Sequence, residues 1–308
     1  MPSGTFGAPG SFGAFGTLGA FGASPFRRRA RPERLVRRRR MPPGSMYVLP
    51  EVFSPQMFNS RDVYVYLPPS YGRGDFRFPV IYMQDGQNLF DPALSFAGSW
   101  RVDLAMAAAA RLGFEAIVVG VANTGSARLD EYGPFLEPSI GAGGVADLYV
   151  DFLLDTVKPQ IDDEFRTLPE REQTGIAGSS MGGLVSLYAF FNAPHKFGGC
   201  GALSPALWFG QRAIFDWLER APRVHGRVYL DVGTAEGKST LHDARRLRDL
   251  LVEKGYVPGR DLRYVEESGA AHEERAWGRR VEDALPFLLG LPEAGEEGPP
   301  MDPITTTD

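Results

Sequence analysis

Short apolar runs alternate with helical segments over most of this chain, and this order constrains the fold more than any other feature of the sequence. Continuous apolar stretches at 78–83 and 116–121 are typical of strands buried on both faces, and the alanine-rich segment 99–112 between them is predicted to be a helix. Strands that alternate with helices form a mostly parallel, twisted sheet with helices on both faces, an α/β fold. Further strands are expected near 173–178, 198–203, 227–232 and 262–266, and further helices at 144–166, 182–193, 211–220, 241–254 and 273–289.

The segment 61–67 has a different pattern, because its polar and apolar residues alternate and Pro68 and Pro69 follow it. Such a pattern is typical of a half-buried antiparallel strand near the edge of a sheet. No second break in composition occurs before Leu291, so the simplest interpretation is one domain over residues 46–290.

Residues 1–45 differ in composition from the predicted domain. The first 24 residues are a low-complexity tract of Gly, Phe and Ala, and the whole segment holds nine arginines against one acid. We expect a disordered extension, or a start site assigned too far upstream, because the tract has too little aliphatic mass to pack. The arginines follow the tract, an order that does not fit an export signal and favours a cytoplasmic protein. Residues 291–308 are expected to form a disordered tail.

Composition excludes several classes of protein. Hydrophobic residues make up 43% and charged residues 23% of the 308 residues, which are values typical of globular domains. No apolar run approaches 18 residues, so no membrane span is expected. Outside the arginine-rich segment the chain is acidic, which argues against nucleic-acid binding by the folded domain. One cysteine, Cys200, and four histidines leave no internal disulfide and no Cys/His zinc site, so neither a metal nor a cofactor is expected.

The strongest local signal is the sequence G-x-S-x-G at 178–182, which lies between a predicted strand and a predicted helix. A serine on such a sharp turn has a strained backbone, and small residues two positions away on either side let the turn close. Ser180 has glycine at both positions, whereas Ser179 is flanked by Ala177 and Met181. We therefore predict that Ser180 is a nucleophile at the N-terminus of the following helix.

A serine nucleophile needs a base, and four histidines can be tested for this role. His195 lies about 15 residues along the helix that begins after the serine, and His225 precedes a strand, so both are expected far from the serine turn. His272 follows the last predicted strand, at the carboxyl edge of the sheet where the serine turn also lies. His272 is the predicted base, and His242, at the start of a helix, ranks second.

The carboxylate that orients the base is expected where the strand before His272 ends. Glu236 lies in the turn after the strand at 227–232 and is the first choice. Asp243, on the following helix, remains the alternative. Asp231 lies within the strand and is expected to have a structural role.

Ester hydrolysis also requires N–H donors for the oxyanion that forms on the substrate. The backbone N–H of Met181, at the start of the helix, is predicted to be one donor. The turn after the strand at 78–83 is predicted to supply the other from Gln87, because Gly86 permits a close approach of the backbone. Asn88, the next residue of this turn, is expected to face the substrate.

Several sequence blocks between residues 46 and 290 occur in the order and at the spacings of a known family. They are DGQNLFDP at 85–92, Ser95-Phe96 with Trp100, the segments 122–128 and 131–134, the serine turn at 175–183, Leu203-Ser204-Pro205 with Trp208, Gly233-Thr234-Ala235-Glu236, and Gly269 with His272 and Trp277. With these blocks the chain resembles the putative esterase family of α/β hydrolases, which includes esterase D, feruloyl esterases, enterochelin esterases and mycolyltransferases.

The resemblance implies a single-domain α/β-hydrolase fold with Ser180 as nucleophile, His272 as base, Glu236 as acid and oxyanion donors from Gln87 and Met181. Many family members have His at the position of Asp85 and Asp at the position of Glu236. The second departure is tolerable, because either carboxylate can orient an imidazole.

The connections of the sheet indicate where a substrate would bind. Only one helix fits between the strands near 203 and 226, so no lid domain is expected and the site should be open. The longest connection, 122–143, is the expected substrate-facing wall, with Arg128, Tyr132 and, from another loop, Trp208 as contacts. Arg128 would either bind a substrate carboxylate or pair with Glu131, and the sequence leaves both alternatives open.

The predicted function is hydrolysis of a carboxylic ester by a serine esterase through an acyl-enzyme intermediate. The expected partner is a small, soluble acyl ester, either a sugar-linked acetyl or feruloyl ester or a siderophore-type ester. One alternative is an acyltransferase that uses the same triad, although the chain has no long hydrophobic insertion for a fatty acyl chain. The other is a non-catalytic binding protein on a hydrolase scaffold, which the presence of every triad candidate disfavours.

Overall fold

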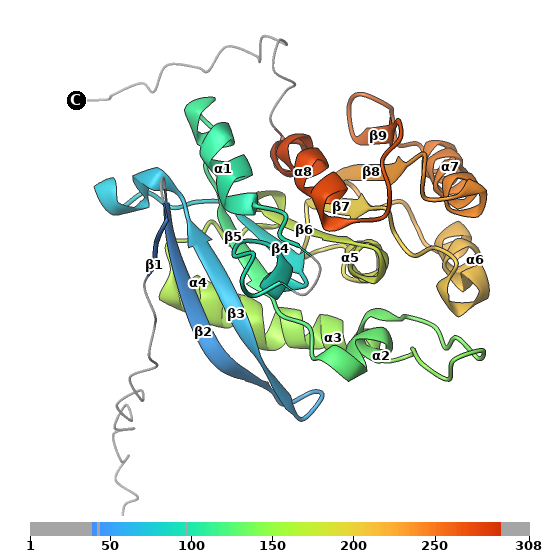
Figure 1. The fold of residues 1–308 in the computed structure, drawn as a ribbon, viewed down its shortest axis with the longest axis horizontal. Coiled ribbons are helices and arrows are strands. Elements are labelled where there is room, and N and C mark those ends of the chain that lie inside the picture. The colour runs from blue at the N-terminus through green and yellow to red at the C-terminus, as the bar shows by residue number, and fades with distance from the viewer. Residues whose placement is uncertain (1–38, 42–43, 96–97, 291–308) are drawn as a thin grey trace, which may run out of the picture. The chain divides into compact units, whose positions relative to one another are not determined.

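The computed structural model describes residues 39–41, 44–95 and 98–290 of the chain. The predicted low-complexity tract, most of the arginine-rich segment and the predicted tail at 291–308 lie outside the described residues. Within the described part, the chain forms one mixed sheet with helices on both faces (Figure 1).

Nine strands within the described residues form the sheet, in the order β1-β2-β3-β5-β4-β6-β7-β8-β9. The neighbours from β1 through β3 to β5 pair antiparallel, whereas all neighbours from β5 through β4 to β9 are parallel. The mostly parallel sheet predicted from the alternation of strands and helices is thus confirmed. The strands are β1 (Arg39–Met41), β2 (Gly44–Ser54), β3 (Asn59–Leu67), β4 (Val80–Gln84), β5 (Ile117–Val121), β6 (Thr174–Ser179), β7 (Gly199–Leu203), β8 (Arg227–Gly233) and β9 (Leu262–Glu267).

The predicted antiparallel strand 61–67 is β3, the third strand from one edge of the sheet, but it is buried along most of its length rather than half-buried. β3 pairs with β5 on one side and with β2 on the other. The sequence pattern did not reveal β2 because Pro50 interrupts it, and the register shifts there at a bulge in which Glu51 has φ 50°. Because β2 begins at Gly44 and pairs with β1, the sheet extends beyond the predicted domain boundary at residue 46.

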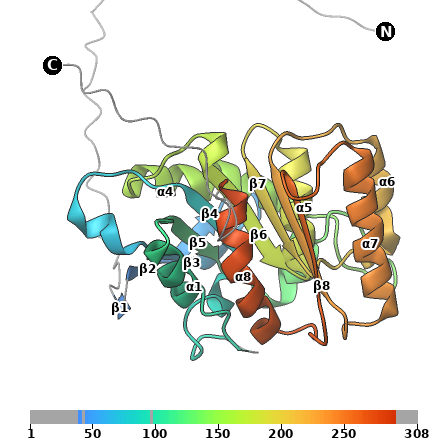
Figure 2. The same ribbon diagram turned by 90° about the horizontal axis from the view of Figure 1, so that it is seen from above.

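Helices α1 and α8 cover one face of the sheet, and the other helices cover the opposite face (Figure 2). The predicted helix 144–166 forms as α3 and α4, separated by a π-helical turn at Leu153–Val157. The short helix α2, inside the long connection 122–143, was not predicted. None of the helices in the described part is long and apolar enough to cross a membrane. The helices are α1 (Val102–Arg111), α2 (Arg128–Tyr132), α3 (Ala146–Phe152), α4 (Lys158–Glu164), α5 (Met181–Asn192), α6 (Ala213–Arg220), α7 (Lys238–Glu253) and α8 (Glu274–Leu288).

Alternate side chains of the central strands enter two separate hydrophobic cores. In β4, Val80 and Tyr82 pack into the core formed with α3 to α7, whereas Ile81 and Met83 pack into the core formed with α1 and α8. Each of these four residues is at most 2% exposed. Burial on both faces explains why this strand reads as a continuous apolar run without an alternation of polar and apolar residues.

The carboxyl ends of four parallel strands lead to the predicted site residues. β4 leads into the turn with Gln87, β6 into Ser180, β8 into the turn with Glu236, and β9 into the loop with His272. Parallel strands of one sheet end at the same edge, so the topology brings together residues that are far apart in the chain. Between β7 and β8 the chain forms one 3-10 turn and the single helix α6, as the predicted open site requires.

Candidate active site

Ser180 occupies the sharp turn between β6 and α5. Its backbone has φ 53° and ψ −122°, a conformation that costs free energy for any residue with a side chain. Two backbone hydrogen bonds hold the turn against the end of β7. The N–H of Ser180 donates to the carbonyl of Leu203 (3.0 Å), and the carbonyl of Ser180 accepts from the N–H of Ala206 (2.9 Å). A Cβ atom on Gly178 would lie 2.6 Å from the backbone of Gly182, so the turn closes only with glycine there.

His272 lies between Ser180 and Glu236. Its Nε2 atom is 2.9 Å from the hydroxyl oxygen of Ser180, and its Nδ1 atom is 2.7 Å from Oε2 of Glu236. An ionised carboxylate can only accept, so Nδ1 carries the ring proton and Nε2 is left to accept the serine proton. The indole of Trp277 packs edge-on against the imidazole, with ring centroids 4.8 Å apart. The geometry is therefore that of a nucleophile, a base and an orienting acid.

Glu236 is held rigidly in the turn after β8. Its side chain is 1% exposed, and its Oε1 atom accepts hydrogen bonds from the N–H of Gly233 (2.7 Å) and the hydroxyl of Ser204 (2.6 Å). Burial alone would raise the pKa of Glu236, but the hydrogen bonds from His272, Ser204 and Gly233 hold that pKa below its ordinary value. The carboxylate is thus charged near neutral pH and directs its second oxygen at His272.

The two other carboxylates considered from the sequence lie in different environments. Both oxygens of Asp243, a buried residue of α7, accept from Nε of Arg212, at 3.0 and 2.9 Å. Asp231 is completely buried beneath Glu236, where it accepts from the N–H of Ser204 at 2.9 Å and lies 3.2 Å from Arg280. Burial raises the pKa of Asp231 to about 7 despite the arginine. His272 is in hydrogen-bonding contact with Glu236 rather than with either of these aspartates.

The two predicted oxyanion donors come from the turn after β4 and from the start of α5. Met181 is the first residue of α5, and the first N–H groups of a helix have no partner within the helix. Gln87 lies in the 3-10 turn Gly86–Asn88, and its side-chain carbonyl accepts from the N–H of Asn123 at 3.2 Å. A Cβ atom on Gly86 would lie 2.3 Å from the carbonyl oxygen of Gly120, so glycine is required for this turn to pack on β5.

Arg128 has a different partner from the one considered in the sequence. It donates to both carboxylate oxygens of Asp85, at 2.7 and 2.8 Å, and Asp85 also accepts from the side-chain amide of Asn123 at 2.7 Å. The alternative that Arg128 pairs with Glu131 is wrong, because Glu131 accepts two hydrogen bonds from Arg61, both at 2.9 Å. Arg128 therefore fastens the long connection to the turn after β4.

The remaining predicted substrate contacts differ in how far their side chains are exposed. Tyr132 is fully buried and its hydroxyl accepts from the N–H of Asp85 at 3.2 Å, so it supports the turn from behind and is not exposed to a substrate. Asn88 is half-buried and its side-chain carbonyl accepts from the hydroxyl of Ser95 at 3.2 Å. Trp208 is 49% exposed, whereas the neighbouring Phe209 is buried. Trp208 thus remains available to an incoming molecule.

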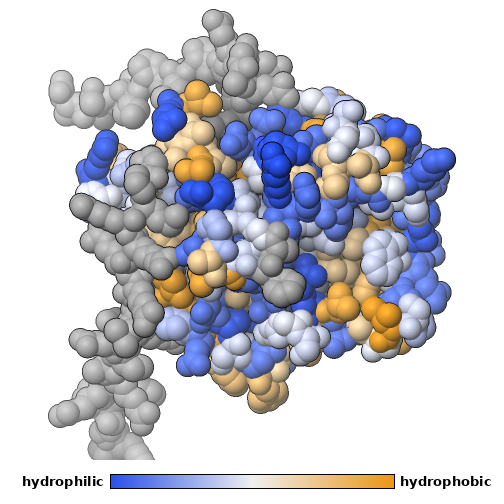
Figure 3. Space-filling view, in the orientation of Figure 1, coloured by the Kyte–Doolittle hydropathy of each residue, from blue (hydrophilic) through white to orange (hydrophobic). Residues whose placement is uncertain are grey.

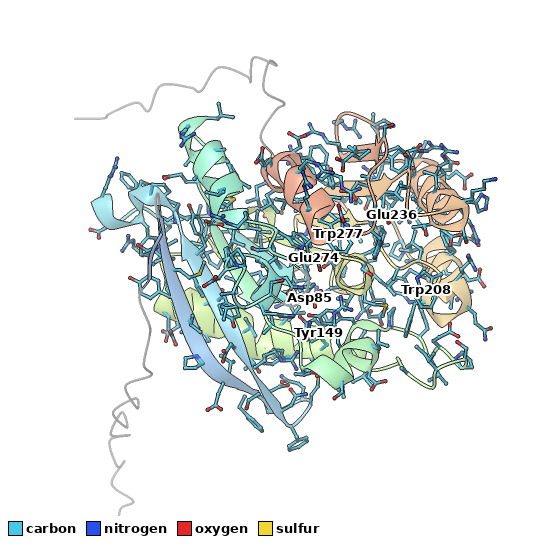
Figure 4. All side chains as sticks on the ribbon, viewed as in Figure 1. Asp85, Tyr149, Trp208, Glu236, Glu274 and Trp277 are labelled. Carbon is cyan, nitrogen blue, oxygen red and sulfur yellow. The ribbon has the colours of Figure 1, made fainter. Side chains whose placement is uncertain are left out.

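Figure 4 shows Asp85, Glu236, Trp277 and Trp208 arranged around α5, which is seen nearly along its axis. These residues come from four separate segments of the chain. The helix that they surround, α5, begins directly after Ser180. Hydrophobic side chains gather at the lower right of this face in Figure 3, over the segment between α2 and α3, where Leu136 and Ile140 are 57% and 53% exposed. The segment between α2 and α3 thus presents apolar side chains on this face of the molecule.

Three residues close to Glu236 were given no role by the sequence. Ser204 and Trp277 belong to blocks of the family resemblance, and that placement was the available signal. Arg280 gave no signal, because one arginine among many on a helix is ordinarily a solvated charge. In the structure it is 5% exposed and lies 3.7 Å from Glu236 and 3.4 Å from Glu267.

The chain is similar to proteins of known sequence and structure over most of its length. It is 27% identical over 238 residues to the uncharacterized protein YbbA of Bacillus subtilis, covering 73% of this chain and 91% of YbbA. It is 31% identical over 151 residues to the siderophore triacetylfusarinine C esterase of Aspergillus fumigatus, covering 46% of this chain and 48% of that enzyme. The crystal structure of the BES protein from Bacillus cereus superposes with a TM-score of 0.65 at 20% identity, over 83% of this chain and 98% of that one.

The sequence profile of the family described as "Putative esterase" matches residues 54–288. This range contains the serine turn, the turn with Gln87 and the loop with His272, and it covers most of the described sheet. The resemblance inferred from the sequence blocks is therefore confirmed, and with it the α/β-hydrolase-like fold. The chain belongs to the putative esterase family.

Proposed function

We propose that this protein is a carboxylic ester hydrolase in which Ser180, His272 and Glu236 form the catalytic triad. The observation that carries the proposal is the continuous hydrogen-bonded line from Ser180 Oγ through the imidazole to Glu236 Oε2, with distances of 2.9 and 2.7 Å. In this arrangement the Nε2 atom removes the serine proton as the hydroxyl attacks the ester carbonyl, and the buried carboxylate stabilises the imidazolium.

The negative charge that develops on the carbonyl oxygen falls between the start of α5 and the turn after β4. The N–H groups of Met181 and Gln87 are the proposed donors to this oxyanion, and removing one such donor costs about 3 kcal/mol of transition-state stabilisation. His272 then donates its proton to the leaving alcohol, and an acyl-enzyme remains on Ser180. A water molecule activated by the same imidazole hydrolyses the acyl-enzyme and restores the hydroxyl.

The proposed substrate is a small, soluble acyl ester. A siderophore-type ester is favoured by the similarity to the siderophore triacetylfusarinine C esterase. The alignment with that enzyme covers 46% of this chain. The half-exposed Trp208, two residues after the Ala206 that bonds the carbonyl of Ser180, supports an apolar or aromatic part in the substrate, as a feruloyl ester would also have. We propose Trp208 and Asn88 as substrate contacts. Arg128 is left out, because its guanidinium is held by both carboxylate oxygens of Asp85.

The test is a panel of p-nitrophenyl acetate, longer acyl esters, feruloyl esters and a triacetylfusarinine-type ester, assayed with wild type and Ser180→Ala. We expect turnover with wild type and a loss of about 10⁶-fold in kcat with Ser180→Ala, as in other serine hydrolases that lose the nucleophile. Mass spectrometry should show an acylated Ser180 under single-turnover conditions. Activity that survives Ser180→Ala would overturn the proposal, and transfer to an added alcohol in preference to water would assign the same site to an acyltransferase.

A further inference from the structure

The hydroxyl group of Ser204 lies at the centre of a buried cluster behind the acid of the proposed triad. Ser204 follows β7, is 1% exposed and has φ 40°. Its backbone N–H lies within hydrogen-bonding distance of both the carbonyl (3.1 Å) and the side chain (2.9 Å) of Asp231. Its hydroxyl contacts Glu236, which follows β8, and two residues of α8, so the serine is fixed between these two elements.

Three partners surround this hydroxyl, and their chemistry determines which way its proton points. The indole N–H of Trp277 and the Nη2 atom of Arg280 both donate to the hydroxyl oxygen, each at 3.1 Å. Neither group can accept a hydrogen bond, and together they use both lone pairs of the oxygen. The single proton of Ser204 is therefore directed at the third partner, Oε1 of Glu236, 2.6 Å away.

We propose that Ser204 is a positioning residue that holds the carboxylate of Glu236 ionised and correctly rotated, with Trp277 and Arg280 fixing the direction of its hydrogen bond. The proposal rests on the triad proposed above. With Oε1 held by Ser204 and by the N–H of Gly233, Oε2 is the oxygen that faces Nδ1 of His272. His272 is thereby kept in the tautomer with its proton on Nδ1, which leaves Nε2 free to act as a base.

The charged groups around the cluster agree with this role. The Arg280 side chain is 4% exposed and lies between three carboxylates, those of Asp231 (3.2 Å), Glu267 (3.4 Å) and Glu236 (3.7 Å). Its closest hydrogen-bonding partner is nevertheless the neutral hydroxyl of Ser204. Arg280 therefore reaches Glu236 mainly through Ser204, and it supports the negative charge of the acid without competing with His272 for Oε2.

Trp277 joins the base to the same cluster. Its ring packs edge-on against the imidazole of His272, at an interplanar angle of 87°, while its N–H donates to Ser204. One side chain thus restrains the rotation of the base and directs the hydroxyl that restrains the acid. Loss of the N–H alone should loosen the acid and leave most of the packing on His272 in place.

The experiment compares Ser204→Ala with Ser54→Ala, a control at a fully buried, hydrogen-bonded serine on β2, outside the site. Ser204→Ala keeps the Cβ atom, so it leaves the backbone strain at this position unchanged. We expect Ser204→Ala to lower kcat by about 10- to 100-fold, with KM for p-nitrophenyl acetate within about twofold of wild type, as for other groups that orient a functional side chain. Ser54→Ala should leave both constants near wild type.

The second readout is ¹⁵N NMR of protein labelled at histidine, in which four residues give signals. Above neutral pH, wild-type His272 should be almost wholly the Nδ1–H tautomer, and Ser204→Ala should increase the Nε2–H population. A structural role for Ser204 would lower the melting temperature without moving this ratio. Trp277→Phe, which keeps a ring beside His272 but removes the N–H, should shift the ratio in the same direction and provides the test if Ser204→Ala does not fold.

The outcomes separate this proposal from the one on which it rests. Full activity in Ser180→Ala would overturn the triad itself. An inactive Ser180→Ala together with wild-type kcat and an unchanged tautomer ratio in Ser204→Ala would overturn the positioning role and leave the triad in place. A lower kcat with an unchanged tautomer ratio would also overturn it, because the loss would then come from the fold.

Discussion

Arg128 donates to both carboxylate oxygens of Asp85, so a residue of α2 holds the turn that precedes the proposed oxyanion donor Gln87. The side chain of Asp85 is 7% exposed and that of Arg128 is 24% exposed. Burial would lower the pKa of Arg128, but the hydrogen bonds and charge of Asp85 hold it above its ordinary value. Arg128 is therefore not available to bind a substrate carboxylate, because its charge is already neutralised by the two oxygens of Asp85.

Replacing Arg128 should therefore reduce stability as well as activity. Arg128→Met leaves the charge of Asp85 largely buried and unpaired, and we expect the free energy of unfolding to fall by about 2–3 kcal/mol. Urea denaturation measures this change. The double variant Asp85→Asn/Arg128→Met, which removes both charges, should recover at least half of the loss. An Arg128→Met protein as stable as wild type would show that the pair contributes no such coupling.

The strained backbone of Ser180 predicts that replacing this serine with glycine raises the stability of the protein while abolishing its activity. Glycine adopts φ 53° and ψ −122° without steric cost, although it also gains freedom in the unfolded chain. We expect Ser180→Gly to be inactive and more stable than wild type by about 1 kcal/mol in chemical denaturation. Ser180→Ala, which keeps the Cβ atom and so the strain, is the matched control and should differ little from wild type in stability. Equal stabilities of the glycine and alanine variants would argue against stored strain.

The identity of the acid can be decided by two amide substitutions. Glu236→Gln replaces the carboxylate opposite Nδ1 of His272 with an amide that favours the wrong tautomer, so kcat should fall by about 10⁴-fold with little change in KM. Asp243→Asn, whose carboxylate pairs with Arg212, should keep kcat near the wild-type value. Steady-state kinetics on p-nitrophenyl acetate measure both. The opposite pattern, with the Asp243 variant inactive, would move the acid to α7.

Asp231 should make the stability of the protein depend on pH. Its pKa is raised to about 7 in the folded state, chiefly by burial, from an ordinary value of 3.8. Between these values the folded protein keeps a proton that the unfolded chain releases, so the contribution of Asp231 to stability falls as pH rises from about 4 to about 7 and is constant above.

This dependence can be measured against Asp231→Asn, which has no such proton to lose. The free energy of unfolding of wild type, relative to that of the variant, should decrease by at least about 1 kcal/mol between pH 4.5 and pH 7.5. Asp243→Asn, which also removes an aspartate–arginine pair, serves as the control for loss of the pair itself. A difference that stays constant over this pH range would contradict the raised pKa.

Much of the fold could be read from local patterns in the chain. Continuous apolar runs such as 78–83 and 116–121 could be identified because strands buried on both faces need no polar residue. The limits of that approach appear at β2, where Pro50 and a bulge break the pattern, and at α2, a five-residue helix inside a loop rich in glycine and proline. Such elements exist only because neighbouring strands and loops hold them in place.

The sequence by itself determined the parallel sheet, the serine turn and the likeness of the chain to an esterase family, because each of these depends on residues that are close together in the chain. Only the tertiary structure decided which groups Arg128, Tyr132 and Ser204 contact. Their hydrogen bonds to Asp85 and Glu236 span 32 to 47 residues of the chain, and side chains at such separations meet according to how loops pack at one edge of the sheet. That packing determines the burial and hydrogen bonds of Glu236, and these in turn set its charge and orientation. No periodic pattern in the sequence predicts them.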